Sequence, residues 1–275
     1  MTIKQSRFIR RLVEKYNQTD ATPVVNPCDK GQLATKVDTE PSTSERERMS
    51  RRPFRSLIGA LQYLAMGTRP DIAYAVSYIS RFAEEPREVH WNAAIRIVHY
   101  LKGTVNLGIT YKGNSGSVTF VAWSDSDWAS DAQTRRSTTG LMLTMNSGPV
   151  VFKTKLQRTV ALSTAEAEYT AISMCTQEVL WVRALLEELG HAQVRPTTIC
   201  TDNKSAIAIA KNVGYSARAK HVDIRYHFVR AHLADGDIDL QYVPSASQLA
   251  DFLTKPIEGK TFQRLVSVCG LKATS

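Results

Sequence analysis

The sequence SVTFVAWSDSD at residues 117–127 decides the fold. Its valines, phenylalanine and tryptophan favour an extended strand that ends at the two aspartates. The runs TTGLMLTMN (138–146) and PVVFKTK (149–155) predict two further strands, and the NSGP string between them indicates a hairpin turn. Before this stretch the run ITY (109–111) is also strand-like, so the chain changes from helix to strand after Gly103.

A long helix follows these strands. The string STAE at 163–166 matches a capping box, in which the Ser163 hydroxyl accepts a hydrogen bond from the backbone and the Glu166 carboxylate reaches back to the cap. Apolar or small residues then recur every three or four positions until Gly190, which is typical of a helix end. The recurring residues are Tyr169, Ile172, Thr176, Val179, Val182, Leu186 and Leu189.

The rest of this region alternates between strand and helix. We predict a strand at 197–201, a helix at 203–211, a basic amphipathic segment at 218–234, a strand at 238–243 and a last helix at 247–254 that ends before Pro256. Strands that first meander and then alternate with helices indicate a mixed sheet. The sequence therefore predicts an α/β fold with helices packed on the faces of that sheet.

Upstream, residues 54–104 have a helical period. Three apolar stripes predict three helices, separated by the strings GTRPD and EEPRE with their prolines. Between 22 and 50, Pro, Asp, Thr, Ser and alternating charges supply little apolar surface, which favours a linker. The stripes are Leu57, Leu61 and Leu64, then Ile72, Val76 and Ile79, then Trp91, Ile95 and Val98.

Composition limits the partner and the compartment. The chain has 35 Lys and Arg against 26 Asp and Glu, a net charge of +9, which favours polyanionic partners such as nucleic acid. Its four cysteines are far apart and form no C-x-x-C pair, so neither a disulfide framework nor a zinc site is indicated. The first residues are polar and no run of 18 apolar residues occurs, so we expect neither secretion nor membrane insertion.

Four acidic residues lie at the ends or starts of predicted elements: Asp125, Glu168, Asp202 and Asp251. Asp125 and Asp202 end strands that we expect to be parallel neighbours, which places both at one edge of the sheet. Carboxylates gathered there would repel one another unless they bind a cation, and oxygen ligands without His or Cys favour Mg²⁺ or Mn²⁺. Two such ions roughly 4 Å apart support phosphodiester hydrolysis, the chemistry of nucleases.

Neighbouring acidic residues compete for two of these positions. Asp127 lies on the same strand face as Asp125, and either could be a solvated turn residue. Residues two apart on a helix point to nearly opposite sides, so Glu166 and Glu168 cannot share one role. Glu166 already has the capping role, which leaves Glu168 as the candidate ligand.

The other two aspartates also have structural alternatives. Asp202 precedes Asn-Lys-Ser and a helix, so it fits a helix cap as well as a ligand. Asp251 fits a first-turn charge favoured by the helix dipole. Trp123 and Trp128 could stack on a substrate, although Trp123 fits core packing better.

Five strings in a fixed order carry a family resemblance: SDSDWA (124–129), VALSTAEAEYTA (160–171), CTDNKSAIAIAKN (200–212), KHVDIRYHFVR (220–230) and QLADFLTKP (248–256). Together they resemble the ribonuclease H domain of copia-type LTR retrotransposon polyproteins. The resemblance implies a ribonuclease H-like fold, a five-stranded mixed sheet with flanking helices. It also implies that Asp125, Glu168, Asp202 and Asp251 are catalytic and hold two Mg²⁺ ions, with Mn²⁺ as the alternative metal.

The upstream strings FRSLIGALQYLAMGTRPDIAYAVSYISRF (54–82) and HWNAAIRIVHYLKGT (90–104) resemble the segment that joins the polymerase to its ribonuclease H in these elements. No Tyr-x-Asp-Asp string occurs, so we expect no polymerase activity from this chain. The resulting domain prediction is a polymerase-derived remnant helix (1–21), a linker (22–53), a helical connection region (54–104), a ribonuclease H-like domain (105–256) and a C-terminal tail (257–275).

The basic segment at 218–234 is a candidate nucleic-acid contact. Its cationic side chains would lie along backbone phosphates and would position a duplex without reading its sequence. The alternative is a solvated amphipathic helix that packs Val222, Tyr226, Val229 and Leu233 inward. The predicted nucleic-acid-binding residues are Arg218, Lys220, His221, Arg225 and Arg230.

The resemblance implies a metal-dependent endoribonuclease that cleaves the RNA strand of RNA·DNA hybrids during retrotransposon reverse transcription. Its implied partners are the hybrid and the reverse transcriptase polymerase region of the same polyprotein, with no membrane. We expect an intracellular, cytoplasmic setting that includes virus-like particles. One alternative is a non-catalytic nucleic-acid-binding remnant of a decayed retrotransposon polyprotein. Another is a transposase or integrase, whose two aspartates precede a glutamate, whereas Glu168 here falls between aspartates.

Overall fold

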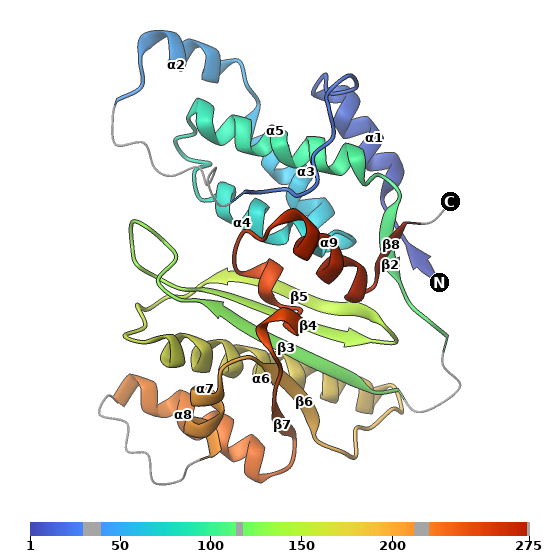
Figure 1. Cartoon of the computed structure of the whole chain (residues 1–275), viewed down its shortest axis with the longest axis vertical. Helices are drawn as coiled ribbons and strands as arrows, with labels where there is room; N and C mark the ends of the chain where they lie inside the picture. The colour runs from blue at the N-terminus through green and yellow to red at the C-terminus, as the bar shows by residue number, and fades with distance from the viewer. Residues whose placement is uncertain (30–39, 114–117, 212–219, 274–275) are drawn as a thin grey trace. The chain divides into compact units, whose positions relative to one another are not determined.

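The computed structural model describes residues 1–29, 40–113, 118–211 and 220–273, without the side chains of 220–223. The chain forms two compact units, shown in Figure 1. Unit 1 comprises Met1–Thr110 and Pro256–Ser275, and unit 2 comprises Tyr111–Lys255. All four cysteines are free thiols. In the part of the chain that is described, no helix combines the length and apolarity that crossing a bilayer requires.

Unit 2 contains a five-stranded sheet in the order β5-β4-β3-β6-β7. β3 (Phe120–Asp127), β4 (Thr138–Met145) and β5 (Gly148–Leu156) pair antiparallel. β6 (Thr197–Thr201) and β7 (Ile238–Tyr242) continue the sheet in parallel on the other side of β3. This arrangement confirms the mixed sheet predicted for a ribonuclease H-like fold.

Three helices cover this sheet and close its core. They are α6 (Thr164–Glu188), α7 (Lys204–Lys211) and α8 (Lys220–Ala234), and Figure 1 shows all three near the sheet in unit 2. The predicted stripe on α6 is largely buried, and it packs against apolar residues of β3 and β4. Tyr226 and Val229 on α8 join the same core, as the amphipathic pattern predicted.

The prediction of a last helix at 247–254 is wrong. The chain forms two short 3₁₀ turns instead, η3 (Ser245–Ser247) and η4 (Asp251–Leu253). The Gln248 side chain between them is fully buried, and its amide donates to the backbone carbonyl of Ser124 on β3 at 3.0 Å. The backbone of Gln248 is extended, with φ −72° and ψ 106°, and so interrupts a helix between the two turns.

Unit 1 is mainly helical. Its core helices are α1 (Ser6–Lys15), α3 (Phe54–Gly67), α4 (Ala73–Ser80) and α5 (Glu88–Gly103), with the turn η2 (Pro70–Ile72) before α4. The two predicted stripes on α3 and on η2–α4 are buried. On α5 the predicted Val98 is buried, together with Ala94, Ile97 and Leu101, while the predicted Trp91 and Ile95 are only half-buried. The predicted stripe on α5 is therefore right at Val98 and off by one position at Trp91 and Ile95.

A small sheet in unit 1 joins distant parts of the chain. β2 (Leu107–Thr110) pairs with β1 (Thr2–Ile3) on one side and with β8 (Leu271–Ala273) on the other, both antiparallel. Ile109 and Thr110 of the run ITY, predicted as a strand, thus lie in this sheet, and Tyr111 follows it. The stretch predicted as a tail contains α9 (Gly259–Val268), whose Phe262, Leu265 and Val266 are buried, and the stretch predicted as a linker contains α2 (Thr43–Ser50). The boundaries of the five predicted segments stay predictions.

A fully buried ion pair lies inside unit 1. The Arg69 guanidinium donates to both carboxylate oxygens of Asp71, at 2.6–3.1 Å, and neither side chain is exposed. The Tyr100 hydroxyl also donates to Asp71, and the remaining Arg69 donors reach the hydroxyl and carbonyl of Thr104. The charges are therefore paired and well supplied with hydrogen bonds, the condition under which a buried ion pair is tolerated.

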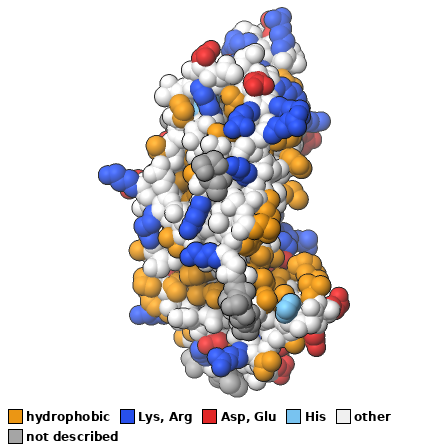
Figure 2. Space-filling model, turned by 90° about the vertical axis from the view of Figure 1, so that its right-hand side faces the viewer, with side chains coloured by type: hydrophobic (Ala, Val, Ile, Leu, Met, Phe, Trp, Pro, Cys, Tyr) orange, Lys and Arg blue, Asp and Glu red, His pale blue; other side chains and the backbone are white. Residues whose placement is uncertain are grey.

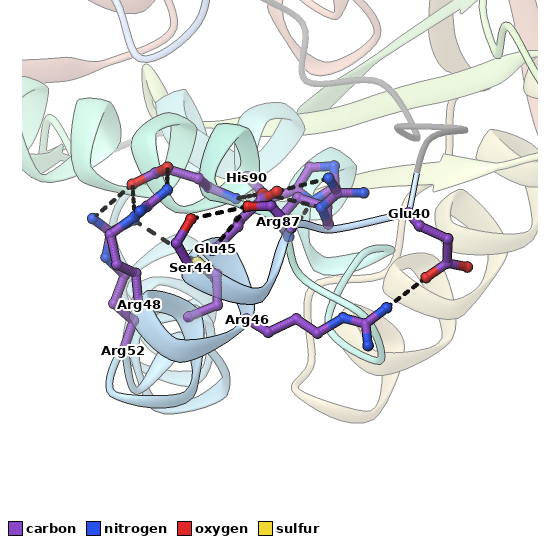
Figure 3. Close-up of polar contacts among 11 residues, drawn as sticks. Glu40, Ser44, Glu45, Arg46, Arg48, Arg52, Arg87 and His90 are labelled. Carbon is purple, nitrogen blue, oxygen red and sulfur yellow. Dashed lines mark hydrogen bonds and ion pairs between the residues drawn. The ribbon is translucent and has the colours of Figure 1, made fainter.

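Charged groups attach the helix α2 to the rest of unit 1, at the start of α5 (Figure 3). The Glu45 carboxylate accepts hydrogen bonds from the Arg87 guanidinium at 2.7 Å and from the backbone N–H of Glu88 at 3.1 Å, at the start of α5. Arg48 and Arg52 reach the Glu88 carboxylate at 3.0 and 3.1 Å. Hydrogen bonding to Arg87 lowers the pKa of Glu45 to about 2. Since α2 has no buried residue, polar contacts rather than apolar burial hold it.

Replacing Asp71 should destabilise unit 1 strongly. Asp71→Ala leaves the Arg69 charge buried without a counter-charge, and we expect a loss of about 3–5 kcal/mol in the free energy of unfolding. Urea denaturation followed by circular dichroism measures it. The control is Arg46→Ala, which breaks the exposed ion pair with Glu40 and should cost less than about 1 kcal/mol. Equal losses in the two variants would contradict this account.

Candidate active site

The register of the sheet brings two predicted aspartates to one edge. β3 and β6 run in parallel, with Ala122 opposite Ile199 and Trp123 opposite Cys200. Asp125 lies two residues beyond this pairing on β3, and Asp202 directly follows β6. Because both strands point the same way, these carboxyl groups meet at the carboxyl ends of the strands, where sites form in such sheets.

The helix α6 supplies Glu168 to the same edge. Ser163 caps the helix by accepting from the backbone N–H of Glu166, and the Glu166 carboxylate accepts from the N–H of Leu162, one residue before the expected partner. Glu166 is thus occupied, as the capping box predicted. Glu168 is buried, and its Oε1 accepts from the backbone N–H of Ser126 at 3.3 Å. Its Oε2 is buried and has no hydrogen-bond partner.

The structure separates Asp202 from the capping role that was its alternative. Asn203 caps α7, since its side-chain oxygen accepts from the backbone N–H of Ala206 at 2.9 Å. The Asp202 carboxylate instead accepts a hydrogen bond of 2.5 Å from the Ser245 hydroxyl in η3. Asp202 is therefore held by the segment that leads to Asp251 and not by the helix it precedes.

A tightly anchored turn at 248–255 carries Asp251. The Gln248 tether to β3 fixes its start, and the Thr154 hydroxyl of β5 donates to the carbonyl of Leu253 at 2.8 Å. Gly140, which pairs with Asp125 in the sheet, leaves room for the turn. A Cβ at this position would come within 2.6 Å of Thr254 and 2.9 Å of the Ala250 carbonyl. Because Gly140 has no side chain, the turn that carries Asp251 can approach the ends of the strands.

These elements gather three of the four predicted ligands. One carboxylate oxygen each from Asp125, Asp202 and Asp251 can be chosen so that all three lie within 4.8 Å of one another. Glu168 is not a member of this triad, but it lies next to it through its bond to Ser126 and interacts electrostatically with Asp125 and Asp202. Asp127, the alternative to Asp125, is also outside the triad.

The crowding of carboxyl groups changes their acidity. Burial raises the pKa of Glu168 to about 9, and the charges of Asp125 and Asp202 add to the shift. Burial also raises the pKa of Asp125 to about 7, with Lys255 opposing and Asp251 reinforcing the change. The pKa of Asp251 is raised by burial in the same way, against the pull of Lys255. Burial and mutual repulsion therefore favour the protonated forms of Glu168 and Asp125, even with the positive charge of Lys255 nearby.

Two residues of the turn that were not predicted as site residues, Thr254 and Lys255, contact the triad. The Thr254 hydroxyl donates to Asp125 Oδ2 at 2.5 Å. The Lys255 Nζ lies 2.9 Å from Asp251 Oδ1 and 3.9 Å from Asp125 Oδ2. Burial lowers the pKa of Lys255, but these two carboxylates more than offset it, so the pKa is raised. The spacing of four between Asp251 and Lys255 was a signal, since such pairs meet on a helical turn.

The predicted nucleic-acid-binding residues are only partly described. Arg218 lies outside the described residues, and so do the side chains of Lys220 and His221. Arg225 donates to the Thr170 hydroxyl on α6 at 3.3 Å, and Arg230 donates to the Ile209 carbonyl of α7 at 2.8 Å. Both guanidinium groups are thus engaged within unit 2, and their role in binding nucleic acid stays a prediction.

The two tryptophans near the strand end differ in their surroundings. Trp123 is half-buried, and its indole N–H lies 3.4 Å from the Thr144 hydroxyl of β4. Trp128 is exposed, and its indole N–H donates to the carbonyl of Ala161 at 3.0 Å. Trp128 therefore stays exposed directly after β3, whereas Trp123 is half-buried within that strand.

The donor set fits a divalent metal. Asp125, Asp202 and Asp251 offer hard oxygen ligands that lie close together, and the buried Glu168 Oε2 lacks a partner. Carboxylate oxygens without nitrogen or sulfur favour Mg²⁺ or Mn²⁺ over zinc.

Comparison with known proteins gives the family. The chain is 36% identical over 270 residues to the retrovirus-related Pol polyprotein from transposon TNT 1-94 of Nicotiana tabacum, a match that covers 98% of this chain and 20% of that protein. It is also 36% identical over 269 residues to the Pol polyprotein from transposon RE1 of Arabidopsis thaliana, with 98% and 18% covered. The chain belongs to the copia-type retrotransposon Pol polyproteins. It spans about a fifth of the length of these curated relatives.

Other comparisons are weaker. No protein-family model matches the chain. Among solved structures, the N-terminal RNase H domain of Rv2228c from Mycobacterium tuberculosis aligns with a TM-score of 0.38 and 14% identity, covering 55% of this chain and 98% of that one. The ribonuclease H-like fold of this copia-type chain therefore rests on its own strand order and not on that score.

A methyl group on Gly140 should disturb the turn that carries Asp251. Gly140→Ala places a Cβ against both side-chain and backbone atoms of the turn, and we expect a loss of about 1–3 kcal/mol in the free energy of unfolding. Gly113→Ala is the matched control in unit 2, because its Cβ would meet no atom within 4 Å. Urea denaturation of both variants measures the difference, and an undisturbed Gly140→Ala protein would contradict the close approach.

Glu168 should give the metal-free protein a distinct pH profile. A carboxyl group with a raised folded-state pKa contributes stability that is fully present below its unfolded pKa near 4.5 and is lost as pH rises through about 9. We expect the free energy of unfolding in EDTA to fall between pH 6 and pH 9 by at least about 1 kcal/mol. Asp125, with a pKa of about 7, acts in the same direction.

The measurement is urea denaturation at a series of pH values for the wild type and Glu168→Gln. Because glutamine stays uncharged at every pH, the variant should show a shallower decline. A wild-type stability that rises over this range would count against the assignment.

Proposed function

We propose that this chain is a metal-dependent endoribonuclease that cleaves the RNA strand of RNA·DNA hybrids during retrotransposon reverse transcription. The observation that carries the proposal is the convergence of Asp125, Asp202 and Asp251 within 4.8 Å, beside the partnerless Oε2 of Glu168. Membership of the copia-type Pol polyproteins supports the setting in reverse transcription.

Some residues of the site would bind the metal, and others orient these ligands. Asp125, Glu168, Asp202 and Asp251 would hold Mg²⁺, or Mn²⁺, as a pair of ions. Bound there, the metal supplies Lewis-acid activation of a water molecule and stabilisation of the leaving oxygen of the phosphodiester. The Thr254 and Ser245 hydroxyls orient Asp125 and Asp202, and the Ser126 N–H orients Glu168. Fixed ligand orientation of this kind preserves affinity and rate.

The charge distribution supports a polyanionic substrate. Unit 1 contains 20 Lys and Arg against 12 Asp and Glu and so holds most of the net charge of +9. Lys and Arg side chains are also widely distributed over the face shown in Figure 2. We therefore propose that unit 1 contributes phosphate contacts without sequence preference, together with the basic residues of α8. The polymerase region of the same polyprotein is the proposed partner, inside the cell, in the cytoplasm and in virus-like particles.

The alternative is a non-catalytic nucleic-acid-binding remnant. It predicts binding that weakens steeply with salt and no cleavage in any divalent metal. All four carboxylates are present and three converge, which favours the enzyme.

The test is cleavage of labelled RNA in an RNA·DNA hybrid by the purified chain with Mg²⁺. Asp125→Asn and Asp202→Asn should each lower the rate by more than about 100-fold, since even the partners of metal ligands often cost 10–100-fold. The control is Asp127→Asn on the same strand, which should keep most of the activity. Equal cutting of double-stranded DNA, or equal losses in Asp125→Asn and Asp127→Asn, would overturn the assignment.

A further inference from the structure

Lys255 places a positive charge among the candidate metal ligands. Its Nζ is within 2.9 Å of Asp251 and 3.9 Å of Asp125, so one ammonium group bridges two members of the triad. The side chain is 32% exposed, whereas that of Asp125 is only 3% exposed. The ammonium group therefore lies against both carboxylates while part of the Lys255 side chain remains open to solvent.

The backbone holds Lys255 in this position through the same turn that carries Asp251. The N–H of Lys255 bonds to the carbonyl of Asp251 at 3.3 Å, and the preceding Thr254 bonds to the same Asp125 oxygen that Lys255 approaches. Lys255 thus cannot be displaced as a whole without moving a ligand. Only its flexible four-carbon side chain can leave, and that side chain has solvent to leave into.

A cation at this location competes with any metal that uses these oxygens. Two positive groups within about 4 Å repel each other strongly in a partly buried site. Lys255 and a divalent ion therefore cannot both occupy the space between Asp125 and Asp251. One must move away before the other binds.

We propose that Lys255 is the internal counter-ion of the site, which neutralises Asp125 and Asp251 when no metal is bound and swings out when a divalent ion enters. The inference rests on the proposed function, since it requires that the triad binds metal. Lys255 then lowers the affinity of the site for the ion and keeps the metal-free carboxylates from destabilising the fold. It acts through the ligands and is a positioning residue.

The first experiment measures metal affinity directly. Mg²⁺ and Mn²⁺ are titrated calorimetrically at pH 8 into the wild type, Lys255→Met, Lys255→Arg and the control Lys153→Met, which removes an exposed lysine paired with Glu178. Lys255→Met should bind the ion at least about tenfold more tightly, because the competing charge is gone. Lys255→Arg restores the charge and should return the affinity towards that of the wild type, and Lys153→Met should leave it unchanged.

The second experiment separates a counter-ion from an ordinary structural ion pair. In EDTA, Lys255→Met should have a lower thermal midpoint than the wild type, since two carboxylates have lost their partner. In saturating Mg²⁺ the two midpoints should coincide, because the metal takes over the neutralisation. A structural role would lower the midpoint equally in both conditions and would overturn the inference.

The outcomes distinguish this inference from the function on which it rests. A wild type that binds neither Mg²⁺ nor Mn²⁺ overturns both. A wild type that binds metal, with a Lys255→Met variant that binds no more tightly, overturns the counter-ion role alone and leaves the proposed nuclease intact.

Discussion

The electrostatic cost of bringing carboxyl groups together at one edge of a sheet governs unit 2. Asp125, Asp202 and Asp251 come from distant parts of the chain, and each would be better solvated if it were apart from the others. The fold overcomes this repulsion with rigid neighbours. The parallel pairing of β3 with β6 positions Asp125 and Asp202. The Gln248 tether and the close approach at Gly140 position Asp251.

The two units handle buried charge in different ways. In unit 1, Arg69 and Asp71 neutralise each other, and Tyr100 and Thr104 supply further hydrogen bonds, so the group is chemically complete. In unit 2, protonation, hydroxyl donors and one lysine only partly compensate the carboxyl groups, and an oxygen of Glu168 is left without a partner. Incompletely paired carboxyl groups with raised pKa values are common at functional sites, whereas the Arg69–Asp71 group is satisfied within the fold.

Local patterns predicted most of the sheet but not its long-range connections. The strands β3 to β5 and the helix α6 follow from β-branched runs, a helical period and a capping box, because all of these are local signals. The pairing of β2 with β1 and β8 depends on residues far apart in sequence, so no local period reveals it. The same reason explains the error at η4, where a buried glutamine bound to another strand overrides the helical pattern.

The carboxylates were predictable because resemblance and element ends agreed on them, whereas Lys255 had only its spacing of four from Asp251 as a signal. That spacing predicts a contact with Asp251, but the approach of Lys255 to Asp125 depends on the turn folding against β3. In α9, by contrast, Phe262, Leu265 and Val266 show the spacing of a buried helical face, and this signal was present in the sequence.

In the sequence, unit 2 lies between the two segments of unit 1, and this order has a consequence for biosynthesis. Because the ribosome delivers the chain from its N-terminus, the whole sheet of unit 2 emerges before α9 and β8 exist. β2 must wait for its partner β8 while the carboxylate-bearing unit can already fold. A nascent chain stopped after Lys255 would thus carry every acidic ligand and yet leave the other unit without its closing strand.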